Sequence, residues 1–500
     1  MFSPSDTIVA LATAPAPAGI GVVRLSGPRA AAIARAMLTL RRDLVPRHAT
    51  LTHVVSRAVA APPAVAAPPA VAAPRTAVGS GFSRILPDDT PRPIDEVVAT
   101  FFPGPHSYTA EDVVEISAHG SLELLRDIVA AAMSGGARLA EPGEFTLRAF
   151  LHGRLDLVQA EAVGDLVNAV TPLQARVAFD QLDGTLTRAI GALDARVFDL
   201  VAKLEASVDF PDEGYHFIDA GEVEAELEGV RDEIDRLLAT AARGRLIREG
   251  RQIAILGKPN VGKSSLFNAL VGTDRAIVTA IPGTTRDLLR ETIDFEGVRL
   301  GLVDTAGIRH TDDEVEREGV ARARGAGGVA DLVLLMVDRS RPLAEEDHAL
   351  LRDTSGAPRL VIVNKCDLPG AWGLGDVPGG PDPAGGDRVG LGAVELSLKT
   401  GEGMDALRRA MREALGMAGS SEPRRDAPAV SNLRHVGLLE GARASLDRAI
   451  VNLRESGELA SEELVIADLA DARRAFEDVT GRRTSEDVLR HIFATFCIGK

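Results

Sequence analysis

Apolar side chains recur every three or four positions over long stretches of the chain. One such run consists of Leu182, Leu186, Ile190, Leu193, Val197, Leu200 and Leu204. This spacing predicts a helix that buries one face, and residues 222–246 repeat the pattern. The pattern returns later in the chain, at residues 433–453, 462–479 and 485–496. We therefore predict one helical bundle, assembled from segments on both sides of an inserted domain.

Between these helical stretches, short apolar runs end in glycine or polar residues. They include Ile253–Leu256, Val298–Val303, Leu360–Val363 and Ala393–Leu396. Apolar runs of this length are typical of buried strands. The stretch from residue 249 to residue 418 is therefore predicted to be an inserted α/β domain. Within it, residues 368–392 are rich in Gly and Pro and predict a loose surface loop.

The first 152 residues differ from both of these regions. Strand-like apolar runs alternate with a helix-like run at residues 30–40, and this mixture predicts a small α+β domain. Residues 60–74 repeat Ala and Pro, a composition that cannot pack a core, and they predict a mobile insertion. The expected fold class is multidomain, with α+β and α/β parts. Its expected domains are an N-terminal α+β domain, the first part of a helical domain, an inserted domain and the second part of the helical domain, at residues 1–152, 153–248, 249–418 and 419–500.

Composition and charge narrow the classes of partner and compartment. The chain has 500 residues with 45% hydrophobic content, enough for about three domains. A net charge of −16 disfavours binding nucleic acid through bulk charge, so any RNA contact needs a local basic patch. Two cysteines indicate a reducing compartment rather than a disulfide framework. No apolar run reaches about 18 residues and the N-terminus lacks a signal-peptide pattern, so we expect a cytoplasmic protein with no membrane partner.

The strand-like run Ile253–Leu256 leads into Gly257-Lys-Pro-Asn-Val-Gly-Lys-Ser264, which is followed by a helix-like run. This order of strand, glycine-rich turn and helix is the context that a phosphate-binding loop requires. Glycines let backbone N–H groups turn toward phosphates, and the helix adds its positive N-terminal end. We expect Lys263 to neutralise the β- and γ-phosphates and the Ser264 hydroxyl to bind Mg²⁺.

Further motifs follow later strand-like runs in the order that a GTPase domain requires. Asp304-Thr305-Ala306-Gly307 has an acidic residue that can reach Mg²⁺ and a glycine N–H that can contact the γ-phosphate. Asn364-Lys365-Cys366-Asp367 offers a carboxylate that can accept two hydrogen bonds from guanine, a donor pair that adenine lacks. Ser397-Leu398-Lys399 is expected to close over the base. The sequence therefore predicts a P-loop GTPase domain with bound GTP.

The expected hydrolytic groups are less ordinary. Ile308 occupies the position where small signalling GTPases carry a water-orienting glutamine. Glu316 is the preferred substitute, and an acidic helix cap is an equally good interpretation of its charge. Asn260 and the stretch 283–287 suggest a monovalent cation in place of an arginine finger, and Thr285 is the natural second hydroxyl ligand of Mg²⁺. In the first domain, Arg24 and Glu115 form either a structural salt bridge or a ligand contact.

Besides the glycine-rich loop and Gly283-Thr-Thr-Arg-Asp287, the chain carries Asp6-Thr-Ile-Val-Ala10 and Phe496-Cys-Ile-Gly-Lys500. Together these four stretches resemble the MnmE (TrmE) family of tRNA uridine modification GTPases. The resemblance implies an N-terminal tetrahydrofolate-binding and dimerising domain, a helical domain and a GTPase activated by K⁺-dependent pairing of its GTPase domains. It also implies a homodimer that joins the FAD protein MnmG in a heterotetramer. That complex modifies carbon 5 of the wobble uridine, position 34, of certain tRNAs to (carboxymethyl)aminomethyluridine.

The resemblance also implies roles for individual residues. The K⁺ ligands would be Asn260, Thr279, Ile281 and Thr284, and the Mg²⁺ ligands would be Ser264 and Thr285. Glu316 would orient the attacking water, which favours that role over the helix cap. Contacts to 5-formyltetrahydrofolate would come from Arg24, Glu115, Arg154 and Lys500, while the role of Cys497 stays open. The full set expected at GTP is Asn260, Val261, Gly262, Lys263, Ser264, Ser265, Thr279, Ala280, Ile281, Pro282, Gly283, Thr284, Thr285, Asp304, Thr305, Ala306, Gly307, Asn364, Lys365, Asp367, Ser397, Leu398 and Lys399.

Some positions depart from the family pattern. Pro15–Gly19 replaces a glycine- and arginine-rich turn, and Arg154 stands where lysine is common, which bears on the folate contacts. Pro282 stiffens the expected K⁺ loop and Leu398 replaces an alanine behind guanine, but neither change removes a ligand. A ribosome-assembly or signalling GTPase that acts purely as a binding switch is the alternative. It would share the nucleotide motifs, but it would not need the folate-type domain or the Cys497 tail.

Overall fold

The computed structural model of the protein describes most of the chain. The described residues are 5–14, 17–56, 92–209, 219–273, 275–276, 289–304, 330–373, 390–417, 427–456, 462–494, 496 and 498–499. The chain forms two compact units, Met1–Glu161 with Arg483–Lys500, and Ala162–Arg482. The expected Pro/Ala insertion at residues 60–74 lies outside the described residues. In the part of the chain that the structure describes, no helix has both the length and the apolar character needed to cross a membrane.

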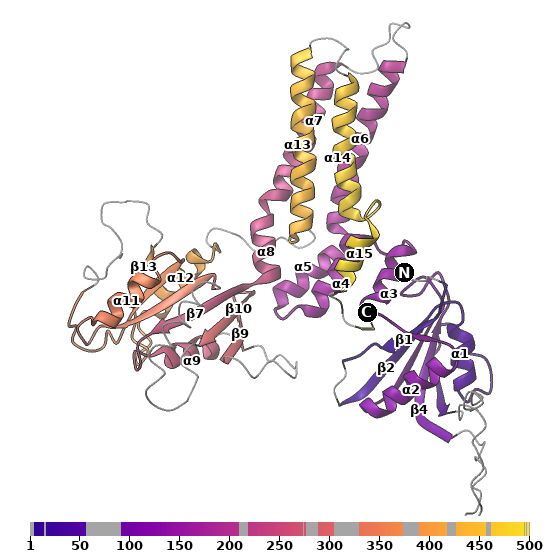
Figure 1. The fold of residues 1–500 in the computed structure, drawn as a ribbon, viewed down its shortest axis with the longest axis horizontal. Helices are drawn as coiled ribbons and strands as arrows, with labels where there is room; N and C mark the ends of the chain where they lie inside the picture. Colours follow the sequence, from indigo (N-terminus) through magenta and orange to yellow (C-terminus); the bar gives the residue numbers. More distant parts are fainter. Residues whose placement is uncertain are drawn as a thin grey trace, which may run out of the picture. The chain divides into compact units, whose positions relative to one another are not determined.

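The first unit is built on a six-stranded sheet in the order β3-β4-β5-β2-β1-β6 (Figure 1). The strands are β1 (Ile8–Leu11), β2 (Ala18–Ser26), β3 (Thr50–Ser56), β4 (Arg92–Phe102), β5 (Val113–Gly120) and β6 (Arg138–Leu139). All neighbouring strands are antiparallel except β1 and β6. Helices α1 (Ala30–Met37) and α2 (Leu122–Ser134) cover the sheet and bury a core that includes Val23, Ile33, Ile116 and Ile128.

Short helices complete the first unit. They are α3 (Glu144–Leu151), the start of α4 (Leu157–Asn168) and α15 (Glu486–Phe493). Leu147, Leu157 and Phe493 pack together in one cluster, which holds residues from the far end of the chain on α3 and α4. Gly143 at the start of α3 has φ 69°, and a Cβ there would lie 2.6 Å from the Phe493 carbonyl oxygen. The close approach of the two segments therefore requires glycine at this position.

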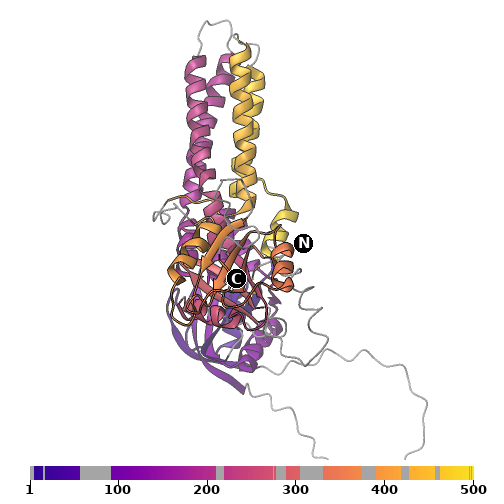
Figure 2. The ribbon, with the colours of Figure 1, turned by 90° about the vertical axis from the view of Figure 1, so that its left-hand side faces the viewer.

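The second unit contains a bundle of long helices. It comprises α5 (Pro172–Leu182), α6 (Thr185–Asp209), α7 (Ala220–Ala239), α8 (Ala241–Glu249), α13 (Leu433–Ser456) and α14 (Glu462–Thr480). Both views show α6, α7, α13 and α14 side by side, and α13 packs against α7 and α14 (Figures 1 and 2). Apolar periodicity missed two breaks: Asp183-Gly184 separates α5 from α6, with Gly184 at φ 84°, and Thr240 separates α7 from α8.

A seven-stranded sheet occupies the chain between α8 and α13, so the expected insertion into the helical bundle is confirmed. The prediction that residues 485–496 belong to the bundle is wrong, because α15 packs in the apolar cluster of the first unit. Its strand order is β13-β12-β11-β7-β10-β9-β8, and only β9 runs against its neighbours. The strands are β7 (Arg251–Gly257), β8 (Arg275–Ala276), β9 (Leu289–Phe295), β10 (Val298–Asp304), β11 (Leu332–Asp338), β12 (Arg359–Asn364) and β13 (Gly390–Glu395). The helices of this region are α9 (Lys263–Thr273), α11 (Glu345–Asp353) and α12 (Met404–Ala414).

The predicted multidomain fold class is confirmed by these two sheets and the helical bundle. The middle of each central strand of the larger sheet is apolar and buried, at residues 253–256, 332–337 and 360–363, as expected for strands covered on both faces. In parallel sheets of this kind, ligands bind beyond the carboxyl ends of the strands. The ends of β7, β10, β11 and β12 are therefore the place to look for a nucleotide site.

Candidate functional site

The loop between β7 and α9 has the backbone geometry of a phosphate cradle. Gly257 has φ 148°, and a Cβ there would lie 2.6 Å from the Met336 carbonyl oxygen. Gly262 has φ 111°, and its Cβ would lie 2.4 Å from the Asn364 side-chain nitrogen. Asn260 between them adopts the left-handed conformation at φ 62°. A side chain would fit at neither glycine, so both are required for the backbone to follow this path.

Lys263 lies at the start of α9 and folds over this loop. Its ammonium donates hydrogen bonds to the carbonyl oxygens of Gly257 at 2.7 Å and Lys258 at 2.8 Å. Ser264 and Ser265 follow in the first turn of α9 and are exposed there, while Val261 is buried. A cationic amine and two exposed hydroxyls therefore lie at the N-terminus of α9, next to the loop, as binding of phosphate and Mg²⁺ requires.

Asn364 at the end of β12 joins this loop to the segment expected behind the base. Its side-chain nitrogen donates to the Val261 carbonyl at 2.7 Å, and its side-chain oxygen accepts from the Leu398 N–H at 3.3 Å. The residue is only 3% exposed. Because both ends of a buried amide are satisfied, the side chain fixes the spacing between the two loops.

The expected base-binding residues lie around Asn364. Asp367 is exposed, and its Oδ1 accepts a hydrogen bond of 2.8 Å from the fully buried Ser397 hydroxyl, which orients the carboxylate. The Lys365 ammonium lies 2.6 Å from Asp338 Oδ2 at the end of β11. Burial raises the pKa of Asp338, but hydrogen bonds from Lys365 and Ser340 outweigh it and hold that pKa below its usual value. Lys399 is exposed beside them.

Several predicted nucleotide-site residues lie outside the described residues. They are Thr279, Ala280, Ile281, Pro282, Gly283, Thr284, Thr285, Thr305, Ala306, Gly307 and Glu316. Asp304 is described through its backbone, which ends β10 in register with Ile255 of β7. This register brings the end of β10 to the same sheet edge as the glycine-rich loop. The remaining K⁺ and Mg²⁺ ligand assignments and the water-orienting role of Glu316 stay predictions.

The first unit brings together two of the residues expected at folate. Arg24 of β2 lies directly opposite Glu115 of β5, and its guanidinium contacts the Glu115 carboxylate at 2.8 and 2.9 Å. The same guanidinium lies over the rings of Tyr108 and Phe145, 5.1 and 5.6 Å from their centroids. Burial raises the pKa of the Tyr108 phenol above its usual value, against the opposing effects of the Thr146 hydrogen bond and the Arg24 charge. Arg24 is thus held by a carboxylate and two aromatic faces.

The C-terminal segment reaches Arg24 as well. The Gly499 carbonyl lies 3.4 Å from Arg24 NH1, so the residue before Lys500 is part of this site. Arg154 donates from Nε to the Ser107 carbonyl at 3.2 Å, next to Tyr108 in the chain. Lys500 and Cys497 themselves lie outside the described residues. Sequence reasoning missed Tyr108 and Phe145, because neither residue lies in a motif and nothing in their neighbours shows that their rings face a guanidinium.

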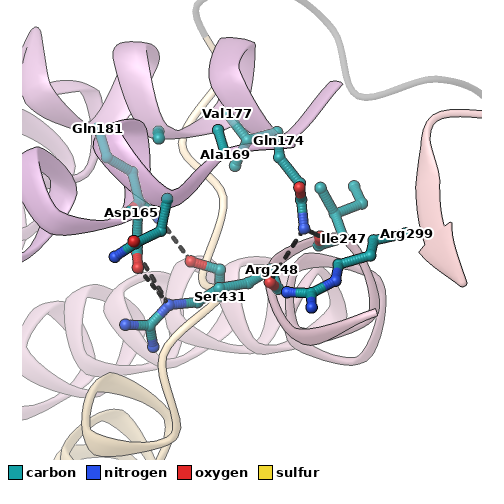
Figure 3. Close-up of a pocket in the computed structure, with 11 residues that line it drawn as sticks. Asp165, Ala169, Gln174, Val177, Gln181, Ile247, Arg248, Arg299 and Ser431 are labelled. Carbon is teal, nitrogen blue, oxygen red and sulfur yellow. Dashed lines mark hydrogen bonds and ion pairs between the residues drawn. The ribbon is translucent and has the colours of Figure 1, made fainter. Parts of the chain in front are cut away.

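A separate cavity of about 90 Å³ lies in the second unit, where α5 meets the end of α8 (Figure 3). Gln174 reaches from α5 and donates to the carbonyls of Ile247 at 2.8 Å and Arg248 at 3.1 Å. Arg248 in turn pairs with Asp165 at 2.8 Å. These contacts satisfy carbonyl groups in the last turn of α8, which leads directly into β7. The cavity therefore marks a polar junction between the bundle and the sheet.

Comparison with known proteins gives matches over almost the whole chain. The family model described as "GTP-binding protein TrmE N-terminus" matches residues 7–154, and that described as "MnmE helical domain" matches residues 157–497. A "tRNA modification GTPase MnmE" from Koribacter versatilis is 40% identical over 99% of both chains. A protein with the same description from Sodalis glossinidius is 40% identical over 100% of both. Among solved structures, the G domain of the T. maritima FeoB iron transporter is 27% identical, covering 33% of this chain and 98% of that one, with a TM-score of 0.23.

Proposed function

We propose a mechanism from the premise that this chain belongs to the MnmE family of tRNA modification GTPases. The protein is a GTP hydrolase that acts in tRNA modification. Its reaction uses GTP bound at the carboxyl edge of the larger sheet. The observation that supports this assignment is the pair of hydrogen bonds made by the Asn364 side chain. They join the glycine-rich loop at Val261 to Leu398, in the segment expected to close over the base.

The finer reaction rests on the family resemblance. Together with the FAD protein MnmG, the protein modifies carbon 5 of the wobble uridine of certain tRNAs to (carboxymethyl)aminomethyluridine. A tetrahydrofolate supplies the one-carbon unit, and the chain acts as a homodimer within a heterotetramer. We place the reaction in the cytoplasm, in keeping with a chain of 500 residues that has only two cysteines. The division into residues 1–152, 153–248, 249–418 and 419–500 is part of the same proposal.

In this proposal, different residues bind the phosphates, the base and the two metal ions. Lys263 leaves the loop carbonyls and donates to the β- and γ-phosphates, because its ammonium lies on a flexible stem against the loop that would cradle them. Asp367, oriented by Ser397, accepts the two guanine N–H donors. Ser264 and Thr285 hold Mg²⁺, which offsets the charge on the phosphates. K⁺ would be held by Asn260, Thr284 and the carbonyls of Thr279 and Ile281. It would supply the positive charge that an arginine finger supplies in other GTPases.

The hydrolytic water is held by Glu316. We assign this role because Ile308 occupies the usual glutamine position and cannot orient water. The family resemblance supports Glu316 over its alternative as a helix cap. Replacing Glu316 with alanine would then nearly stop hydrolysis while GTP binding stays intact. An unchanged rate of hydrolysis would return Glu316 to the helix-cap role.

The potassium assignment is tested with Asn260. GTP hydrolysis is measured for the full chain in KCl and in NaCl at equal ionic strength. The wild-type rate should rise in KCl, whereas Asn260→Ala should lose this rise and keep its affinity for GTP. Asn168→Ala, which removes an exposed amide from α4, is the matched control and should respond to KCl as the wild type does. Equal KCl stimulation of Asn260→Ala and wild type would refute the assignment.

The folate assignment rests on Arg24. Folate molecules carry a negatively charged glutamate tail. Arg24 offers a cation for it, which Glu115 and two aromatic rings hold in place. Arg154 and Lys500 would add positive charge to the same ligand. A switch GTPase that only binds and releases nucleotide has no need for such a site. Titration of the full chain with 5-formyltetrahydrofolate tests the difference, and absence of binding would favour the switch.

A further inference from the structure

Lys258, the second residue of the glycine-rich loop, is paired with a buried carboxylate outside that loop. Its ammonium lies 2.5 Å from Asp347 Oδ2, and the two side chains are 23% and 4% exposed. Asp347 belongs to the first turn of α11, which lies after β11 in the chain. The nucleotide motifs do not include Asp347, and its position in the sequence gives no sign that it contacts the loop.

The position of Asp347 is itself fixed. Its Oδ2 accepts a hydrogen bond from the Ala344 N–H at 2.9 Å, while its Oδ1 is buried with no hydrogen-bond partner among the described residues. At the other end of α11, the buried Arg359 donates to the Leu351 carbonyl and, at 3.0 Å, to the Thr354 hydroxyl. Arg359 therefore ties the last turn of α11 to β12, and the bond from Ala344 orients the carboxylate on the first turn.

The backbone of Lys258 takes part in the phosphate site as well. Its carbonyl accepts from the Lys263 ammonium at 2.8 Å, so the backbone of this residue touches the cation expected at the phosphates. The Asp347 carboxylate is therefore separated from the backbone of the glycine-rich loop by no more than the length of the Lys258 side chain. At such a separation, in a partly buried site, an unbalanced charge has a substantial effect on a bound triphosphate.

We propose that Lys258 and Asp347 form a charge-balancing positioning pair, which fixes the glycine-rich loop and sets its affinity for guanine nucleotides. This inference rests on the proposed function, because it concerns the same nucleotide site. The pair acts through the loop and through its electrostatic field. Neither side chain takes part in the cleavage of GTP.

The proposal predicts opposite effects for the two halves of the pair. Replacing Lys258 with methionine leaves a buried carboxylate whose negative charge faces the phosphates, so affinity falls. Replacing Asp347 with asparagine keeps the fold of the first turn and releases a cation toward the phosphates, so affinity rises. A pair that only stabilised the fold would give weaker binding in both cases, because each variant breaks the same contact.

The experiment measures the affinities of the full chain for a fluorescent GTP analogue and for GDP at low salt. We expect Lys258→Met to weaken binding about tenfold and Asp347→Asn to tighten it about threefold, with slower GDP release. The double variant should lie between the single variants and near the wild type. In hydrolysis assays, Lys258→Met should raise KM and leave kcat nearly unchanged, which is the signature of a lost uniform binding interaction.

Matched variants separate this effect from general charge and from folding. Arg352→Met removes the same charge from an exposed pair with Glu345 on α11 and should change affinity less than twofold. If Lys258→Met does not fold, Lys258→Gln carries the same test. Equal weakening by Lys258→Met and Asp347→Asn would overturn the inference while GTP binding by the wild type upholds the proposed function. A wild-type chain that binds no GTP would instead overturn the proposed function, and this inference with it.

Discussion

The glycine-rich loop and the Arg24 site both hold a cation in place, but they do so by different means. Around Lys263, the acceptors are backbone carbonyls from the same short loop, and two glycines allow the path. Around Arg24, the partners are side chains and a carbonyl from distant parts of the chain, namely Glu115, Tyr108, Phe145 and Gly499. The first site is a local backbone structure, whereas the second exists only when a whole unit is folded.

This difference bears on how each site tolerates change. A local loop keeps its shape through neighbouring residues, so its weak points are its long-range contacts, Asn364 with Val261 and Lys258 with Asp347. A site assembled from distant segments depends on sheet register and on the placement of the C-terminal segment. Substitutions far from Arg24 should therefore affect that site more than equally distant substitutions affect the loop.

The largest effect is expected where the loop depends on a distant residue. Asn364→Ala removes a buried amide and leaves the Val261 carbonyl and the Leu398 N–H without their partner. Two lost hydrogen bonds at about 1 to 1.5 kcal/mol each correspond to a decrease in GTP affinity of about 30- to 140-fold. Fluorescence titration with a GTP analogue measures this. If the affinity equals that of the exposed-amide control Asn168→Ala, the glycine-rich loop does not need its contact with Asn364 in order to bind GTP.

The next largest effect is expected at the Arg24 site, which is assembled from distant segments of the chain. Arg24→Ala removes the charge that Glu115 orients, and we expect binding of 5-formyltetrahydrofolate to fall at least tenfold. Arg24→Lys should recover only part of it, because an ammonium cannot both pair along Glu115 and stack on the rings. Isothermal titration calorimetry measures both variants. Arg126→Ala, which removes an exposed arginine paired with Glu123, is the control and should bind as the wild type does.

The sequence predicts the loop far better than it predicts the Arg24 site, for a physical reason. A phosphate cradle needs glycines and a lysine at fixed spacing, so its chemistry is visible in consecutive residues. The same holds for Asp367 and Ser397, which end or follow strands of one parallel sheet. The contact between Asn364 and Val261 could not be predicted in its geometry, since it depends on how two strand ends meet.

In the first unit, the sequence left Arg24 and Glu115 as either a structural pair or a ligand contact. Their pairing depends on the register between β2 and β5, which no local pattern specifies. The rings of Tyr108 and Phe145 come from a loop and from α3, and neither lies in a motif. Helix breaks at Gly184 and Thr240 were missed for a related reason, because apolar spacing continues across them in the sequence.

A smaller effect should follow from the C-terminal segment. Gly499 has φ 98°, and a Cβ there would lie 2.1 Å from the Leu11 carbonyl oxygen, so Gly499→Ala must displace the segment from β1. We expect binding of 5-formyltetrahydrofolate to weaken about threefold to tenfold, with GTP affinity unchanged. Ile498→Ala, a change at an exposed neighbour, is the control. A loss of GTP affinity, or folate binding equal to the control, would contradict the assembled-site picture.

The smallest effect is a change in stability that is expected only at acidic pH. It concerns the ion pairs of Asp6 and Glu144 with Arg138 and Arg148. Burial raises the pKa values of Asp6 and Glu144, but hydrogen bonds from Arg138 and Arg148 outweigh burial and hold both below their usual values. Because these pKa values are lower in the folded state, the stabilisation is complete above about pH 4.5 and is lost as pH falls through the folded values.

Asp6→Asn should therefore flatten the decline in stability below about pH 4, because one of the carboxylates that must be protonated is gone. The measurement is amide hydrogen exchange of β1, followed from pH 6 to pH 3 and corrected for intrinsic exchange. Asp127→Asn removes an exposed carboxylate from α2 and should leave the decline as steep as in the wild type. A decline equally steep in Asp6→Asn would mean that the ion pairs of Asp6 with Arg138 and Arg148 do not support this unit. The acid-sensitive part of the stability would then rest on the ion pairs of Glu144 with Arg138 and Arg148.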